Sequence, residues 1–136
     1  MDHEQHFWLI DFARSCTSHI LRDFAELESD IKFHGLPTQS LSDFVAFEAA
    51  LSAPKNWSEE PTAILLPTPL QQAFDLIAAV RRIACELLGL QGSMHEYYQA
   101  LFWHTINMVR LKTISVERKH QALLSAAFLA ERLQGN

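Results

Sequence analysis

Two residues near the C-terminal end of the chain have the types and the spacing that a metal site requires. Glu117 and His120 lie three residues apart, which places both side chains on one face of a helix. Carboxylate-bridged iron sites in four-helix bundles use this spacing, but they need two such pairs and two further glutamates. His95 and His104 lie nine residues apart and point to opposite sides of a helix. Because the chain supplies one pair alone, we expect neither a metal site nor another cofactor.

A second candidate lies near the start of the chain, where residues 14–19 read RSCTSH. An arginine followed by a histidine at this distance resembles the Arg-x4–6-His element of HEPN-type RNases, a family of small all-helical domains. The resemblance covers these six residues. It implies that Arg14 and His19 line a cleft between two protomers, where they position and protonate a phosphodiester. A HEPN-like RNase is therefore one alternative function.

The sequence contains no other motif of catalysis. It has no Gly-rich phosphate loop, no Gly-x-Ser-x-Gly elbow and no paired-cysteine zinc pattern. Cys16 and Cys85 fall among apolar neighbours at helical spacing, where buried and unreactive thiols are the rule. We therefore predict that the protein is not an enzyme.

Length and composition predict one helical domain over residues 1–136. Four glycines and five prolines are too few for the frequent turns of a β-sandwich. The longest stretch without a charge has about 14 residues, which is short of the roughly 20 that cross a bilayer. The N-terminus is acidic where a signal peptide would be basic, and the two cysteines form no pair motif. We expect a cytoplasmic protein without membrane contact.

The net charge of −5 is unevenly distributed. Residues 2–60 contain eleven acidic and four basic residues (net −7), and residues 61–136 contain five acidic and seven basic residues (net +2). A mildly acidic chain argues against non-specific binding of nucleic acid. Basic side chains are nevertheless concentrated in one region, which contains Arg110, Lys112, Arg118, Lys119 and His120. A second alternative is therefore a subunit of a nucleoprotein assembly that uses residues 110–120.

Apolar residues recur at steps of three or four along most of the chain, which is the spacing of a helix face. The pattern predicts helices over residues 5–33, 41–52, 69–88, 94–112 and 116–134. The predicted buried stripe of the first helix is Trp8, Phe12, Cys16, Ile20, Phe24, Leu27 and Ile31.

Prolines break the chain between the second and third predicted helices. Residues 53–68 contain three prolines, which exclude a regular helix. Trp57 and the run Ile64-Leu65-Leu66 are too apolar to stay in water, so we interpret this segment as a strap that lies over the bundle. The fold class is then all-α: a compact bundle of four longer helices and one short helix, with a proline-broken strap.

The C-terminal part of the chain has a helical pattern that fits either one long helix or two shorter helices. No glycine or proline occurs between Ser93 and Gln134, but residues 113–116 form a β-branched run with Ser115 as a potential cap. We predict a break there. The alternative is a single helix of about 40 residues that forms an extended dimerising arm.

Aromatic residues on the predicted helix 94–112 mark a binding surface. Trp103 falls in the middle of a polar stripe, which is the composition of an interaction hot spot. The alternative is that the strap or the first helix covers it. The predicted partner-binding residues are Trp103, Tyr97, Tyr98, Gln99, Asn107 and Arg110. On the last helix, Ala122, Ala126 and Ala130 recur every four residues, and this small-residue stripe predicts a dimer interface.

These observations favour a non-catalytic protein-binding module. It would act as a small regulator, adaptor or inhibitor that buries an aromatic helical face against a protein partner. We also expect it to form a homodimer.

Overall fold

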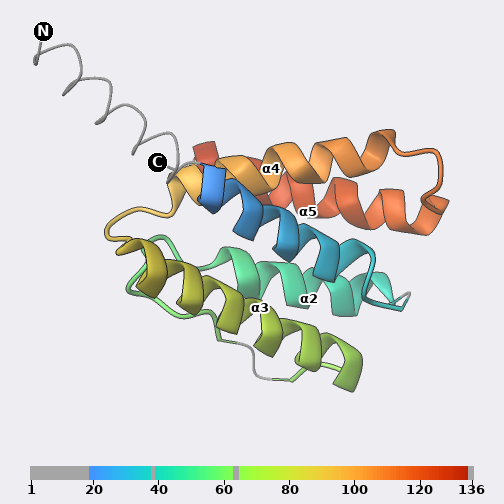
Figure 1. Ribbon diagram of the computed structural model, residues 1–136. Helices are drawn as coiled ribbons and strands as arrows, with labels where there is room; N and C mark the ends of the chain where they lie inside the picture. Colours follow the sequence, from blue (N-terminus) through green and yellow to red (C-terminus); the bar gives the residue numbers. More distant parts are fainter. Residues whose placement is uncertain (1–18, 38, 63–64, 135–136) are drawn as a thin grey trace, which may run out of the picture.

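The computed structural model describes residues 19–37, 39–62 and 65–134. In these residues the chain forms five helices and no strand, so the predicted all-α fold class is confirmed (Figure 1). The N-terminal helix covers residues 19–33 of the described chain. The other four are α2 (Leu41–Ser52), α3 (Thr68–Leu88), α4 (His95–Arg110) and α5 (Val116–Gln134). The predictions for Trp8, Phe12, Arg14 and Cys16 lie outside the described residues.

Local capping explains where the helices begin and end. Ser40 Oγ accepts a hydrogen bond from the backbone N–H of Asp43 at the start of α2. Gly89 ends α3 with φ of 60°, a left-handed conformation that glycine adopts without strain. Ser115 Oγ accepts from the N–H of Arg118 in the first turn of α5. The predicted break between α4 and α5 is therefore confirmed, and the alternative of one long helix is wrong.

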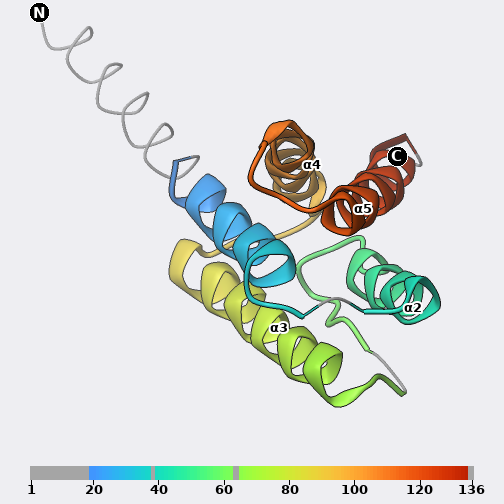
Figure 2. The ribbon, with the colours of Figure 1, turned by 90° about the vertical axis from the view of Figure 1, so that its right-hand side faces the viewer.

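The N-terminal helix lies between α3 and α4 (Figure 2). On the other side of the molecule, α5 packs along α4 and against α2, and α2 packs against α3. Two groups of buried side chains fill the interior. The first, around α2 and α3, includes Phe33, Phe44, Phe47, Phe74 and Ile77. The second, around α4 and the end of α5, includes Leu21, Tyr97, Tyr98, Leu101 and Leu129.

The buried face of the N-terminal helix differs from the predicted stripe. Ile20 and Leu27 are exposed, and Phe24 and Ile31 are half-buried. The buried positions are instead Leu21, Ala25, Glu28, Ser29 and Lys32. The predicted stripe is therefore wrong for Ile20 and Leu27, whereas Phe24 and Ile31 do pack against the core. The difference arises because Glu28 and Lys32 find partners inside the molecule and turn the helix toward them.

The strap runs back along the length of the bundle from the end of α2 to the start of α3 (Figure 1) and lies against α3, and its first part is tied to the α3–α4 connection. Trp57 N–H donates to Gly92 O at 2.9 Å, and Met94 N–H donates to Lys55 O at 2.9 Å. The Trp57 ring packs edge-on against Tyr97, with 5.2 Å between centroids. The expected burial of the apolar run is wrong for Leu65, which is 87% exposed.

Truncation in the core should destabilise the fold. Ile77 is fully buried in the first group, so Ile77→Ala should lower the free energy of unfolding by roughly 2–5 kcal/mol. Urea denaturation followed by circular dichroism measures this loss, with exposed Ile83→Ala on the same helix as the control. Equal losses in the two variants would contradict the assignment of the core face of α3.

Candidate interaction surface and the buried cluster behind it

Trp103 lies on the outer face of α4 and is 59% exposed. The strap does not cover it, because the strap lies against α3 and the α3–α4 connection, where half-buried Trp57 packs against Tyr97. Phe102 supports the exposed indole edge-on, with 5.6 Å between the ring centroids. The structure therefore places a large aromatic side chain in solvent on a rigid helix.

Three of the other predicted partner-binding residues share this outer face, and two do not. Gln99, Asn107 and Arg110 are exposed and recur at steps of three or four around Trp103. Tyr97 and Tyr98 are buried, so their prediction as surface residues is wrong. Their hydroxyls explain the burial: Tyr97 donates to Glu28 Oε1 at 2.7 Å, and Tyr98 donates to Pro54 O.

Behind α4 lies a buried cluster of four charged side chains, Glu28, Lys32, Glu48 and Arg81. Arg81 Nε and Nη2 donate to the two oxygens of Glu28, both at 2.8 Å, and Arg81 Nη1 donates to Leu51 O at 2.7 Å. Lys32 Nζ lies 3.1 Å from Glu48 Oε1 and 3.4 Å from Glu28 Oε2. The two positive and two negative charges balance, as buried charges must.

The cluster fixes the ionisation of its members. Burial alone would raise the pKa of Glu28, but the charges of Arg81 and Lys32 and the hydrogen bonds from Arg81 and Tyr97 outweigh it and hold this pKa at about 2. Burial and the neighbouring Glu28 carboxylate raise the pKa of Tyr97 well above its ordinary value. Tyr97 therefore keeps its proton and donates a hydrogen bond to the Glu28 carboxylate. The cluster joins the N-terminal helix to α2, α3 and α4.

Sequence reasoning missed this cluster, although two signals were present. Glu28 and Lys32 lie four residues apart with opposite charge, which is also the pattern of an ordinary surface pair. Arg81 interrupts an otherwise apolar face of α3. Neither signal identifies a partner that lies 53 residues away in the sequence, as Glu28 and Arg81 do.

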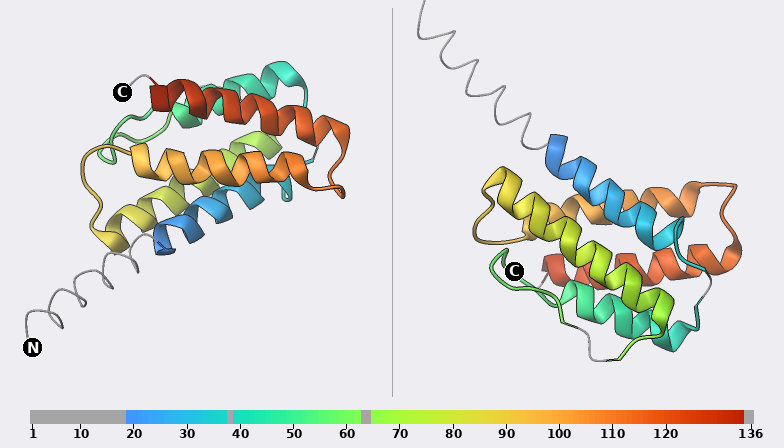
Figure 3. Two further views of the ribbon diagram at one scale, coloured as in Figure 1. Left: turned by 90° about the horizontal axis from the view of Figure 1, so that it is seen from above. Right: turned by 60° about the horizontal axis from the view of Figure 1, so that its bottom comes forward.

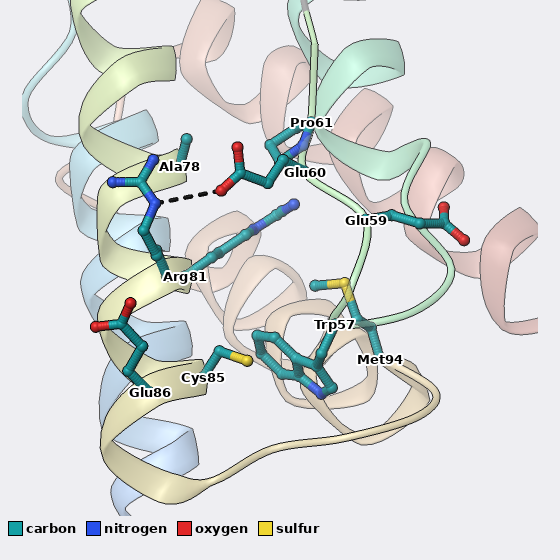
Figure 4. A pocket seen from close by; sticks show the side chains of 10 residues that line it. Trp57, Glu59, Glu60, Pro61, Ala78, Arg81, Cys85, Glu86 and Met94 are labelled. Atoms are coloured by element: carbon teal, nitrogen blue, oxygen red, sulfur yellow. Dashed lines mark hydrogen bonds and ion pairs between the residues drawn. The ribbon is translucent and has the colours of Figure 1, made fainter.

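A small pocket of about 160 Å³ lies between α3 and the strap (Figure 4). Arg82 on α3 reaches across to Glu60 on the strap, with 3.3 Å between Nε and Oε1. The carboxylate of Glu59 accepts from Lys55 N–H and from the Asn56 amide within the strap. These polar groups hold the strap in place, and they form no arrangement of nucleophile and base.

The remaining predicted site residues are dispersed. Ala122 and Ala126 are buried within the chain and Ala130 is half-buried, so the prediction that they form a dimer interface is corrected: the stripe packs inside the bundle. Glu117 and His120 are exposed on the rim of a groove with α2. No group of three or more metal-ligating side chains occurs in the part of the chain that the structure describes.

In the basic region 110–120, not every side chain is available to bind a partner. Arg110 and Lys112 are exposed, but the Arg118 guanidinium donates to Lys32 O and Leu36 O at the end of the N-terminal helix. Of the HEPN-like pair, His19 is exposed and Arg14 lies outside the described residues.

A comparison with known protein families assigns the chain to one of them. Residues 1–108 match the family described as ternary complex associated domain 9. The chain belongs to this family. No curated protein and no solved structure matches it. The match of this ternary complex associated domain includes Trp103 and all four charged residues of the buried cluster, whereas α5 lies beyond it.

The description of the family concerns association with a complex and supports a protein-interaction module. Among the described helices, none is both long enough and apolar enough to span a membrane.

Acid should destabilise the protein through Glu28. The ordinary pKa of about 4.5 applies to the unfolded chain and the pKa of about 2 to the folded chain, so the unfolded state binds the proton first. The stabilisation is complete above pH 4.5 and is lost as the pH falls toward 2. Glu28→Gln should cost roughly 3–5 kcal/mol at pH 7, because Arg81 loses its carboxylate, and should flatten the loss between pH 4.5 and 2.

Urea denaturation at a series of pH values measures both effects, with exposed Glu26→Gln on the same helix as the control. An unchanged pH profile in Glu28→Gln would contradict the role given to this carboxylate.

Proposed function

We propose that the protein is a non-catalytic interaction module, an adaptor or regulator that binds a protein partner through the outer face of α4. Membership of the ternary complex associated domain 9 family, together with the exposure of Trp103, carries this proposal. We also propose that the module acts as a homodimer in the cytoplasm, as the sequence predicts.

The composition of the α4 face favours protein binding. An exposed tryptophan supported by a second aromatic ring presents a large apolar area that loses little conformational freedom on binding. Gln99, Asn107 and Arg110 surround it with hydrogen-bond donors and acceptors. An apolar centre with a polar rim is the usual anatomy of a protein–protein interface.

The buried cluster holds this face in position. Tyr97 lies on the inner side of α4, and its hydroxyl binds Glu28 of the N-terminal helix. Trp103 therefore projects from a helix that is anchored through its opposite side. Such a preformed surface binds with a smaller entropic cost than a surface that must be ordered first.

Capture of the partner from a lysate of the source cells tests the proposal. Trp103→Ala should weaken binding by roughly 2 kcal/mol or more, about thirtyfold in Kd, and should leave the free energy of unfolding nearly unchanged. The tagged wild-type chain, Trp103→Ala and the control Leu65→Ala are compared by mass spectrometry, and their stabilities are compared by urea denaturation.

A protein that the wild type and Leu65→Ala recover, and that Trp103→Ala loses, is the expected result. Recovery of RNA alone, or equal recovery by all three chains, would contradict the proposal. Unfolding of Trp103→Ala would show that the side chain has a structural role.

A further inference from the structure

The outer face of α4 continues into the turn that joins α4 to α5, and there it becomes basic. Arg110 is exposed seven residues after Trp103, which places both side chains on one side of α4. Leu111 and Lys112 follow as exposed residues of the turn, and Val116 is 65% exposed at the first position of α5. We call this continuous stretch the α4–α5 surface, and it consists of Trp103, Arg110, Leu111, Lys112 and Val116.

Positive charge is concentrated in this hairpin of helices. Residues 97–130 contain four basic and one acidic residue (net +3), whereas the rest of the chain contains seven basic and fifteen acidic residues (net −8). The acidic residue, Glu117, lines the groove with α2. Because α4 and α5 run side by side in opposite directions (Figure 3), Glu96 and Glu131 lie at the other end of the hairpin, far from the turn.

The cations near the turn are available to bind an anion. Within the described residues, neither Arg110 nor Lys112 makes an ion pair or a side-chain hydrogen bond, and the same holds for half-buried Lys119. By contrast, Lys32 and Arg81 are held by buried carboxylates. The positive charge at the turn is therefore not compensated within the described fold.

The mixture of charge and apolar area favours a protein segment as the occupant. Leu111 and Val116, 42% and 65% exposed, lie on either side of Lys112 in the sequence, and the Trp103 indole lies two turns of helix before Arg110. An acidic segment with bulky apolar side chains satisfies both kinds of group. A nucleic acid instead requires several phosphate-facing cations, and it would be repelled by the net charge of −5 on the whole chain.

We propose that the protein partner binds the α4–α5 surface through an acidic segment. Its carboxylates face Arg110 and Lys112, and its apolar side chains contact Trp103, Leu111 and Val116. The proposal rests on the interaction module proposed above and names the chemistry of its partner. Since Glu96 lies at the far end of α4, the acidic residues of the segment lie toward the turn.

Fluorescence anisotropy with the purified full chain tests this charge preference. The probe is a labelled synthetic peptide with leucine on one face of a helix and glutamate on the other, and a matched peptide has glutamine in place of every glutamate. The wild type should bind the glutamate peptide at least about tenfold more tightly, and salt should reduce the difference because the pairing charges are exposed.

Variants of the chain locate the contact. Lys112→Glu should weaken binding of the glutamate peptide by at least about tenfold, because it turns an attraction into a repulsion. The control Lys55→Glu makes the same change at an exposed lysine of the strap and should bind as the wild type does. Trp103→Ala should weaken binding of both peptides, and circular dichroism should show all the chains folded.

Equal binding of the two peptides, binding of neither, or equal losses in Lys112→Glu and Lys55→Glu would overturn the acidic partner. The Trp103 face would survive that result if Trp103→Ala still loses the protein that the wild type captures from a lysate. Single-stranded DNA and phosphatidylserine vesicles are the phosphate probes. If Lys112→Glu abolishes binding to one of them and the wild type shows no preference for the glutamate peptide, the cations serve phosphate and the proposal fails.

Discussion

The buried ion pair of Glu28 and Arg81 is the contact on which the arrangement of the helices depends. Two hydrogen bonds of 2.8 Å join the N-terminal helix to α3. The Tyr97 hydroxyl adds α4, and the bond from Arg81 to Leu51 O adds the end of α2. A buried charge without its partner costs several kcal/mol. All four helices therefore contribute to one cluster, since removal of any one of them takes a hydrogen-bond or ion-pair partner from a member of the cluster.

This polar interior has a consequence for the surface. Glu28 and Lys32 occupy inward positions of the N-terminal helix, so that Ile20 and Leu27 lie at its exposed edge. On α3, Arg81 turns inward while Ile83 and Leu87 turn outward. The same side chains that define the fold thus leave apolar groups free for association. An interaction module needs this combination of a well-packed frame with exposed apolar groups.

The sequence predicted the helices well because their ends are encoded locally. Ser40, Gly89 and Ser115 act through their immediate neighbours, and the positions of α2 and α3 follow from them. The buried face of the N-terminal helix was predicted only in part, through Phe24 and Ile31, because the partners of Glu28 and Lys32 lie far along the chain. The sequence places Trp103 in the middle of a polar stripe, but only its exposure in the complete fold decides that the strap leaves it uncovered. The spacing of apolar residues predicts the helices, whereas buried charge pairs such as Glu28 and Arg81 can be identified only in the complete fold.

Native-state hydrogen exchange of the full chain tests most directly whether the buried cluster unites the helices. The central backbone amides of the N-terminal helix, α2, α3 and α4 should share one opening free energy, equal to that of global unfolding. This result follows if no helix can leave without removing a hydrogen-bond or ion-pair partner from the cluster. Amides of one of these helices that exchange through a separate opening, several kcal/mol below global unfolding, would contradict the account.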